Sequence, residues 1–395
     1  MDGVNVKKKK ILIVAHHLTI GGVQKSLISA LKAIDYEKFD VTLYLRKNRT
    51  DLLAFIDERV NVIINDDNTR YYRKPYAVVL QILIAFLGAL GKKTEAEKLN
   101  KKLSDYIIKS QMEYEKNEFF SSTKYDIAIA YVHGYTALFT ATSVNADKKF
   151  MFHHASVDEL HAVHERIIDK FNKIVAIHSE QKELIKQWYP EIADRITIVE
   201  NYCDKALIEE QSKEFTVEKP ENKTVLCSCG RFSNVKGFDL AVEAAKILKE
   251  KQVQFLWLFV GDGPERASLE KLIEKDNLQE YIKLTGMQKN PYPYMNACDI
   301  YVQPSYEESL GLTILEAHRL NKPVIATITM GGLKTIKNNT NGVLCDINAK
   351  SISAAIENVI KDKAGFEGIK TNLINTDYSK EFNKYKTQWR NLLEE

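Results

Sequence analysis

The stretch DIYVQPSYEESLGLTILEAHRL, residues 299–320, contains the pattern that decides the fold. Its first part, DIYVQPS, is an apolar run typical of a buried strand, and LTILEAHRL has the spacing of a helix. A loop with a glycine joins them, so the amides of Gly311, Leu312 and Thr313 are expected at the helix N-terminus. Backbone N–H groups at such a position lack partners and attract anions. The stretch therefore predicts a strand, a turn with an anion site, and a helix.

Two glutamates stand on either side of this turn. Glu308 lies in the loop before the helix, and Glu316 lies about one turn inside it. A glutamate near a helix start is also a routine stabilising residue, which is the structural interpretation of Glu316. We expect the two carboxylates to flank the anion site and not to pair with each other.

The same alternation fills the C-terminal half of the chain. Apolar runs such as TVLCSCG (224–230), FLWLFVGDG (255–263) and PVIAT (323–327) alternate with helical patterns such as GFDLAVEAAKILKEK (237–251). Short apolar strands between helices indicate a parallel sheet covered on both faces. We therefore predict an α/β fold with a doubly wound sheet in this half.

The N-terminal half shows the pattern too, with apolar runs that include KILIVAH (10–16) and YDIAIAYV (125–132). A polar stretch around residues 203–223, with Pro220, marks the predicted domain boundary. The sequence thus predicts an N-terminal domain at 1–205 and a C-terminal domain at 206–375. A last helix, 376–395, could return to the N-terminal domain.

Composition limits the function classes. The chain has 395 residues and a formal net charge of +3, which gives no general attraction for nucleic acid. None of the five cysteines stands at zinc-finger spacing, and Cys227 and Cys229 are expected to be buried thiols on one face of a strand. No apolar stretch reaches the roughly 18 residues of a membrane span. We expect a cytoplasmic chain without a metal centre.

Residues 70–118 interrupt the alternation as an insertion. The segment YAVVLQILIAFLGALGKK, residues 76–93, is apolar and ends in lysines. Two interpretations remain open: a buried helix pair packed on the N-terminal domain, or a peripheral segment that contacts an anionic membrane at its inner face.

Ligands of open α/β sheets bind beyond the carboxyl ends of the strands, so the turns there contain the candidate residues. Gly21 and Gly22 open a helix after the first strand, where amides could meet an anion. His153 and His154 follow another strand, and at most one should face a ligand. Two cations, Arg231 and Lys236, follow TVLCSCG in the loop RFSNVKG (231–237), as a diphosphate clamp would require. Each of these could also be structural or solvated.

Taken together, these turns resemble those of retaining glycosyltransferase family 4, of GT-B fold. The element ESLGLTILEA (308–317) resembles the family's E-x7-E motif, and GRFSNVKGFD (230–239), VGDGP (260–264) and NKPVIAT (321–327) also match. The resemblance implies two Rossmann-like domains that face each other across a cleft, an acceptor-binding one and a nucleotide-sugar-binding one. The sequence resembles in particular the glycosyltransferases of capsular and exopolysaccharide synthesis.

The resemblance also implies roles for individual residues. In the family, separate residues of the donor site contact the diphosphate, the sugar, the ribose and the base of the nucleotide sugar. The family typically needs no metal ion. The corresponding residues here are Arg231 and Lys236 (diphosphate), Gly311, Leu312 and Thr313 (diphosphate, through their amides), Glu316 (ribose), Met287 (base), Glu308 and His153 (beside the transferred sugar), and Gly21 and Gly22 (glycine loop).

The implied function is retaining transfer of a hexosyl or N-acetylhexosaminyl group from a nucleotide sugar, expected to be a UDP-sugar, to a glycan or lipid-linked acceptor. A GT-B nucleotide-sugar epimerase and a non-catalytic partner subunit are the alternatives. Ser309 and Leu310 depart from the family's usual Gly and Phe, so donor choice could differ here.

Overall fold

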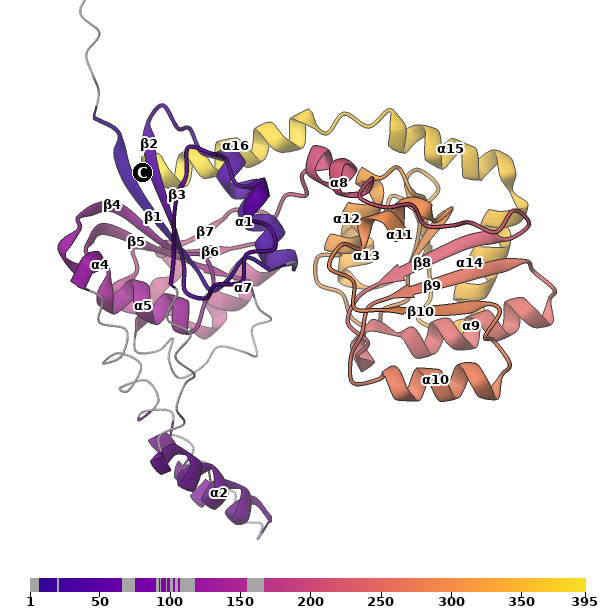
Figure 1. Cartoon of the computed structure of the whole chain (residues 1–395), viewed down its shortest axis with the longest axis horizontal. Helices are drawn as coiled ribbons and strands as arrows, with labels where there is room; N and C mark the ends of the chain where they lie inside the picture. The colour runs from indigo at the N-terminus through magenta and orange to yellow at the C-terminus, as the bar shows by residue number, and fades with distance from the viewer. Residues whose placement is uncertain are drawn as a thin grey trace, which may run out of the picture. The chain divides into compact units, whose positions relative to one another are not determined.

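The structure is a computed structural model, which describes residues 7–19, 21–65, 75–89, 92, 94–96, 98–99, 102–103, 106, 118–154 and 167–395. Contacts between residues divide the chain into two compact units. Unit 1 comprises residues 1–202 and 381–395, and unit 2 comprises residues 203–380. Figure 1 shows an open sheet with surrounding helices in each unit.

Unit 1 contains a seven-stranded parallel sheet in the order β3-β2-β1-β4-β5-β6-β7. Its strands are β1 (Lys9–Ala15), β2 (Phe39–Leu45), β3 (Asn61–Ile64), β4 (Tyr125–Ala130), β5 (Ala146–His153), β6 (Lys173–Ala176) and β7 (Ile196–Ile198). Its helices and short helical turns are α1 (Gly22–Ala33), η1 (Leu53–Phe55), α2 (Pro75–Ala89), α4 (Glu118–Ser122), α5 (Tyr135–Ser143), η3 (Ile168–Lys170), α7 (Ser179–Trp188), η4 (Pro190–Arg195) and α16 (Ser379–Glu394).

Unit 2 contains a six-stranded parallel sheet in the order β10-β9-β8-β11-β12-β13. Its strands are β8 (Thr224–Cys229), β9 (Phe255–Val260), β10 (Ile282–Gly286), β11 (Ile300–Gln303), β12 (Val324–Thr327) and β13 (Gly342–Cys345). Its helices and short turn are α8 (Lys205–Gln211), η5 (Asn234–Lys236), α9 (Phe238–Glu250), α10 (Arg266–Lys275), α11 (Tyr292–Ala297), α12 (Leu312–Arg319), α13 (Met330–Thr335), α14 (Ala349–Lys361) and α15 (Lys363–Ile374).

Both faces of the unit 2 sheet are buried, which explains its continuous apolar strands. On one face, Leu226 and Trp257 belong to a core shared with α9, α10 and α14. On the other face, Cys227, Cys229 and Leu258 pack with α8, α11 and α12. The two thiols are buried and free, as the strand alternation predicted. These contacts confirm the predicted doubly wound α/β fold.

The last helix, α16, packs on unit 1 through its apolar face. Trp389 is fully buried, and its ring stacks on Phe152 of β5 with 5.3 Å between ring centroids. Tyr385 is also buried, and its ring stacks on that of Tyr202 with 5.4 Å between ring centroids. At its end, Lys38 donates to Glu394 over 2.6 Å.

The strand order places a topological switch point in each sheet. In unit 2 the chain runs from β8 through β9 to β10 on one side, and from β11 through β12 to β13 on the other. The crevice between the carboxyl ends of β8 and β11 is therefore the expected ligand site. In unit 1 the corresponding point lies between β1 and β4.

Within the described ranges, no helix has the length and apolar character needed to cross a membrane. The insertion contributes α2, and much of the rest of 70–118 lies outside the described residues. The same holds for residues 90, 91 and 93 of the predicted membrane segment 76–93.

Candidate functional site

Lys236 and Glu308 meet at the switch point of unit 2. Lys236 ends the turn that follows β8, and Glu308 lies in the loop that follows β11. The two strands are neighbours, with Tyr301 paired to Cys227, so both loops leave the sheet at the same edge. The ammonium nitrogen of Lys236 lies 2.7 Å from Oε2 of Glu308. Side chains 72 positions apart in the sequence thus form one ion pair where a ligand would bind.

A glycine makes this approach of the two loops possible. Gly237, directly after Lys236, has a φ of 64°, which side chains other than glycine rarely adopt. A Cβ atom there would lie 2.0 Å from the carbonyl oxygen of Pro304, in the other loop. The backbone at Gly237 therefore fixes the distance between the strand ends.

The predicted anion site is the start of α12. Gly311 precedes this helix in a left-handed conformation, with a φ of 70°, and Leu312 is its first residue. Oε1 of Glu308 accepts a long hydrogen bond, 3.4 Å, from the amide of Gly311. The carboxylate therefore lies between the helix N-terminus and the lysine, two features that both favour negative charge.

Gln303, the last residue of β11, organises these groups and was not identified from the sequence. Its buried amide oxygen accepts hydrogen bonds from Thr313 over 2.9 Å and from Tyr301 over 3.0 Å. Its amide nitrogen donates to Ser305 over 2.7 Å and, at 3.4 Å, to Glu308. One side chain thus connects the loop that contains Glu308 to the first turn of α12.

Glu316 is buried in the second turn of α12, with 6% of its surface exposed. Its Oε1 accepts a hydrogen bond of 2.8 Å from the hydroxyl of Tyr292 on α11. Burial, together with the nearby Glu316 carboxylate, raises the pKa of Tyr292 well above its usual value, so this phenol stays protonated and donates. Tyr292 was not predicted either; it fixes the orientation of a carboxylate that can accept further hydrogen bonds.

The other predicted residues of unit 2 lie at the same edge of the sheet. Arg231 is exposed in the loop after β8 and forms no ion pair with any residue that the structure describes. Met287 follows β10 and has 80% of its surface exposed. Both are accessible to a ligand, and their roles stay predictions.

In unit 1, the predicted residues follow β1 and β5. Gly21 is the N-cap of α1, and Gly22 is its first residue. His153 is fully buried at the end of β5, and its Nδ1 lies 3.1 Å from the amide nitrogen of Gln181. The next residue, His154, is half-buried, and burial lowers the pKa of its imidazole to about 3, so the ring is neutral at pH 7. The predicted role of His153 stays a prediction.

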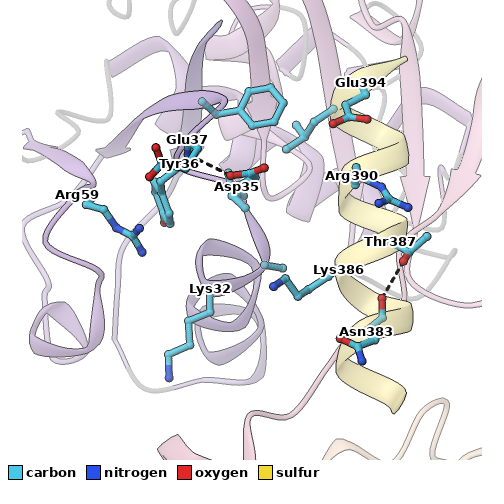
Figure 2. Close-up of a pocket in the computed structure, with 14 residues that line it drawn as sticks. Lys32, Asp35, Tyr36, Glu37, Arg59, Asn383, Lys386, Thr387, Arg390 and Glu394 are labelled. Carbon is cyan, nitrogen blue, oxygen red and sulfur yellow. Dashed lines mark hydrogen bonds between the residues drawn. The ribbon is translucent and has the colours of Figure 1, made fainter. Parts of the chain in front are cut away.

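A hollow of about 680 Å³ lies elsewhere in unit 1, between α16 and the turn from α1 to β2 (Figure 2). It lies at the amino end of β2, which begins at Phe39, and none of the predicted site residues lines it. Two of the charged residues that line it pair with residues outside its lining, Arg59 with Asp57 and Glu394 with Lys38. The switch point of unit 2 is the better candidate.

The residues at the switch point suit an anion better than a metal ion. Among the described residues, no group of three or more His, Cys, Asp or Glu side chains could hold a metal ion. Lys236, Arg231 and the α12 amides provide positive charge, and Glu316 provides a hydrogen-bond acceptor. A diphosphate on Lys236 would take the place of Glu308, whose carboxylate also accepts hydrogen bonds from the amides of Gly311 and Gln303.

Three comparisons with known proteins show what the chain is similar to. Residues 209–381 match the family model described as glycosyl transferases group 1. The lipopolysaccharide core biosynthesis glycosyltransferase LpsE of Rhizobium meliloti is 33% identical over 149 residues, which cover 38% of this chain and 43% of that protein. The poly(ribitol-phosphate) alpha-N-acetylglucosaminyltransferase of Staphylococcus aureus is 24% identical over 334 residues, which cover 78% of this chain and 63% of that protein. The matched part thus spans less than two thirds of either relative.

The fold as a whole is similar to that of solved structures. Anabaena HepE, in its complex with UDP and glucose, superposes with a TM-score of 0.66 at 18% identity, over 98% of this chain and 99% of that chain. This chain therefore has the two-domain α/β fold of GT-B glycosyltransferases, and its residues 209–381 carry the likeness to glycosyl transferases group 1.

Proposed function

We propose that the chain is a retaining glycosyltransferase of family 4 that transfers a sugar from a nucleotide sugar to a glycan or lipid-linked acceptor. The observation that carries this proposal is the Lys236–Glu308 pair beside the start of α12, at the switch point of unit 2. The name of one relative assigns it to lipopolysaccharide core biosynthesis, and that of another to poly(ribitol-phosphate) glycosylation. Both names support an acceptor of the cell surface.

In this proposal the donor binds to unit 2. The diphosphate takes the place of Glu308 on Lys236, next to Arg231 and the amides of Gly311, Leu312 and Thr313. The carboxylate of Glu316, oriented by Tyr292, accepts from the ribose hydroxyls, and Met287 contacts the base. A UDP-sugar is the proposed donor, which the UDP bound in the HepE structure supports. Unit 1 is the proposed acceptor domain; His153 is proposed to lie beside the transferred sugar, and Gly21 and Gly22 to form the glycine loop that contacts the donor.

The chemistry follows from charge. Breaking the sugar–phosphate bond leaves a diphosphate with additional negative charge and a sugar with cationic character. Preorganised donors at the departing oxygens lower this barrier, and here they are a lysine, an arginine and helix amides. Glu308, once released from Lys236, would lie on the sugar side and stabilise its positive charge. We propose that the acceptor attacks from the same face, without a metal ion.

A lipid-linked acceptor would place the chain at the inner face of the membrane. We therefore propose that residues 76–93 make a peripheral contact with anionic lipid.

A thermal-shift screen over nucleotide sugars tests the donor site without knowledge of the acceptor, because a ligand of the native state raises the melting temperature. We expect one nucleotide class to stabilise the chain and Lys236→Ala to weaken this effect. Incubation with the stabilising UDP-sugar alone then distinguishes the alternatives. Formation of a 2-epimer would favour an epimerase, and no binding at all would favour a non-catalytic partner subunit.

A further inference from the structure

Helix α2 is apolar but too short to span a bilayer. Its 15 residues, PYAVVLQILIAFLGA, include no charged side chain. At 1.5 Å per residue the helix is about 22 Å long, whereas the hydrocarbon core of a bilayer is about 30 Å thick. An apolar helix of this length is stable in water only when its faces are covered.

One face of α2 is covered. Leu80 is buried with Leu103, and Ile84, Leu99 and Tyr106 pack against them. The helical residues after α2 thus already supply a partner for this face.

The other face is a stripe of exposed apolar side chains, which we call the α2 stripe: Val79, Ile82, Leu83 and Phe86. Their exposed fractions are 53%, 64%, 43% and 61%. The spacing i, i+3, i+4, i+7 places all four on one side of the helix. A buried helix pair would cover these positions, so the stripe does not agree with that interpretation of the insertion.

Positive charge follows the stripe along the chain. Residues 90–103 contain five lysines and two glutamates, a net charge of +3. Lys92, Lys98 and Lys102 are exposed. An apolar face flanked by lysines is typical of helices that lie in the interface of an anionic bilayer. A second copy of the chain would bring the same positive charge with it, so self-association through the stripe is disfavoured.

We infer that the α2 stripe lies flat in the interface of an anionic bilayer, with Lys92, Lys98 and Lys102 at the phospholipid headgroups. The inference deepens the proposed function and rests on it in one respect: a lipid-linked acceptor would be presented at this surface. The contact itself requires neither donor nor acceptor.

Flotation of the full chain with vesicles tests the inference. We expect binding to vesicles of phosphatidylcholine with 30% phosphatidylglycerol, and at least tenfold less binding to pure phosphatidylcholine or at 0.5 M NaCl. The variant with Ile82→Asp and Phe86→Asp should bind at least tenfold less. A matched control replaces Leu184 and Trp188 by Asp, because these are 40% and 45% exposed on α7 at the same i, i+4 spacing. The control should float like the wild type.

Melting temperature and nucleotide binding separate the possible outcomes. Both variants should melt like the wild type and bind UDP as the wild type does, so a change in flotation would reflect the stripe and not the fold or the donor site. Equal flotation of the wild type and the α2 variant would overturn the inference. It would also be overturned if light scattering showed a dimer that the α2 variant dissociates, because the stripe would then bind a second copy.

Discussion

Lys236 is the residue whose removal separates the proposed chemistry from the stability of the fold. Lys236→Ala removes one cation at the proposed diphosphate and leaves Glu308 with hydrogen bonds from the amides of Gly311 and Gln303. Loss of one preorganised donor typically lowers kcat by about 10²- to 10³-fold, or about 2.7–4 kcal/mol of transition-state stabilisation. We expect a loss of this size in sugar transfer.

The cost to stability should be much smaller. The side chains of Lys236 and Glu308 are 28% and 12% exposed, and Glu308 keeps two other hydrogen bonds without the lysine, so we expect a cost near the upper limit of about 1 kcal/mol for exposed pairs. For a domain of this size, 1 kcal/mol changes the melting temperature by about 2–4 °C. Lys246 on α9, in the same unit, provides a matched control, because its ammonium nitrogen forms an ion pair of 2.8 Å with Asp276. Lys246→Ala should change stability by a similar amount and leave activity unchanged.

The assay is release of the nucleoside diphosphate from the donor that the thermal-shift screen identifies, measured with a coupled enzyme, alongside melting of all three proteins. Activity of Lys236→Ala within about threefold of the wild type would refute the assignment of Lys236 to the diphosphate. An equal loss of activity in Lys246→Ala would refute it too, because any lost ion pair in unit 2 would then lower activity.

Three further predictions concern buried groups. Gln303→Glu should lower activity at pH 7 by at least tenfold and restore part of it at lower pH, because it places a second carboxylate beside Glu308; a pH profile of kcat measures this, and a flat profile would contradict it. Tyr292→Phe should raise the KM for the donor more than it lowers kcat, because it removes the hydrogen bond that orients Glu316; steady-state kinetics with unchanged KM would argue against that role. His318 is buried, and burial lowers its pKa from 6.5 to about 4. Between pH 6.5 and pH 4, the unfolded chain therefore binds a proton at this residue that the folded chain does not bind. Stability should therefore fall by about 3 kcal/mol as the pH decreases from 6.5 to 4, and denaturant titrations of a His318→Asn variant should show a weaker pH dependence.

The sequence predicted the strands well because strands buried on both faces read as continuous apolar runs. TVLCSC and YDIAIA appear in the structure as β8 and β4. Helix α8, in contrast, lies within the polar stretch that was interpreted as a boundary. It has seven residues, of which Leu207, Ile208 and Gln211 are buried, and two apolar positions are too few to give a helical period in the sequence.

The candidate site was predicted in part for a similar reason. Glycines and charges at strand ends are visible in the sequence, and they pointed to Lys236, Glu308 and Gly311. Gln303 and Tyr292 were missed because their function depends on contacts between distant segments. Gln303 reads as the polar end of a strand, and Tyr292 reads as a core aromatic residue until its hydroxyl is seen to donate to Glu316.

The most direct test of the central claim is a crystal structure of the chain with UDP. We expect phosphate oxygens within hydrogen-bond distance, about 3.2 Å or less, of Nζ of Lys236 and of the amides of Leu312 and Thr313. Glu308 should be displaced from Lys236, and the ribose should contact Glu316. A diphosphate bound away from the switch point of unit 2, with the Lys236–Glu308 pair intact, would contradict the account.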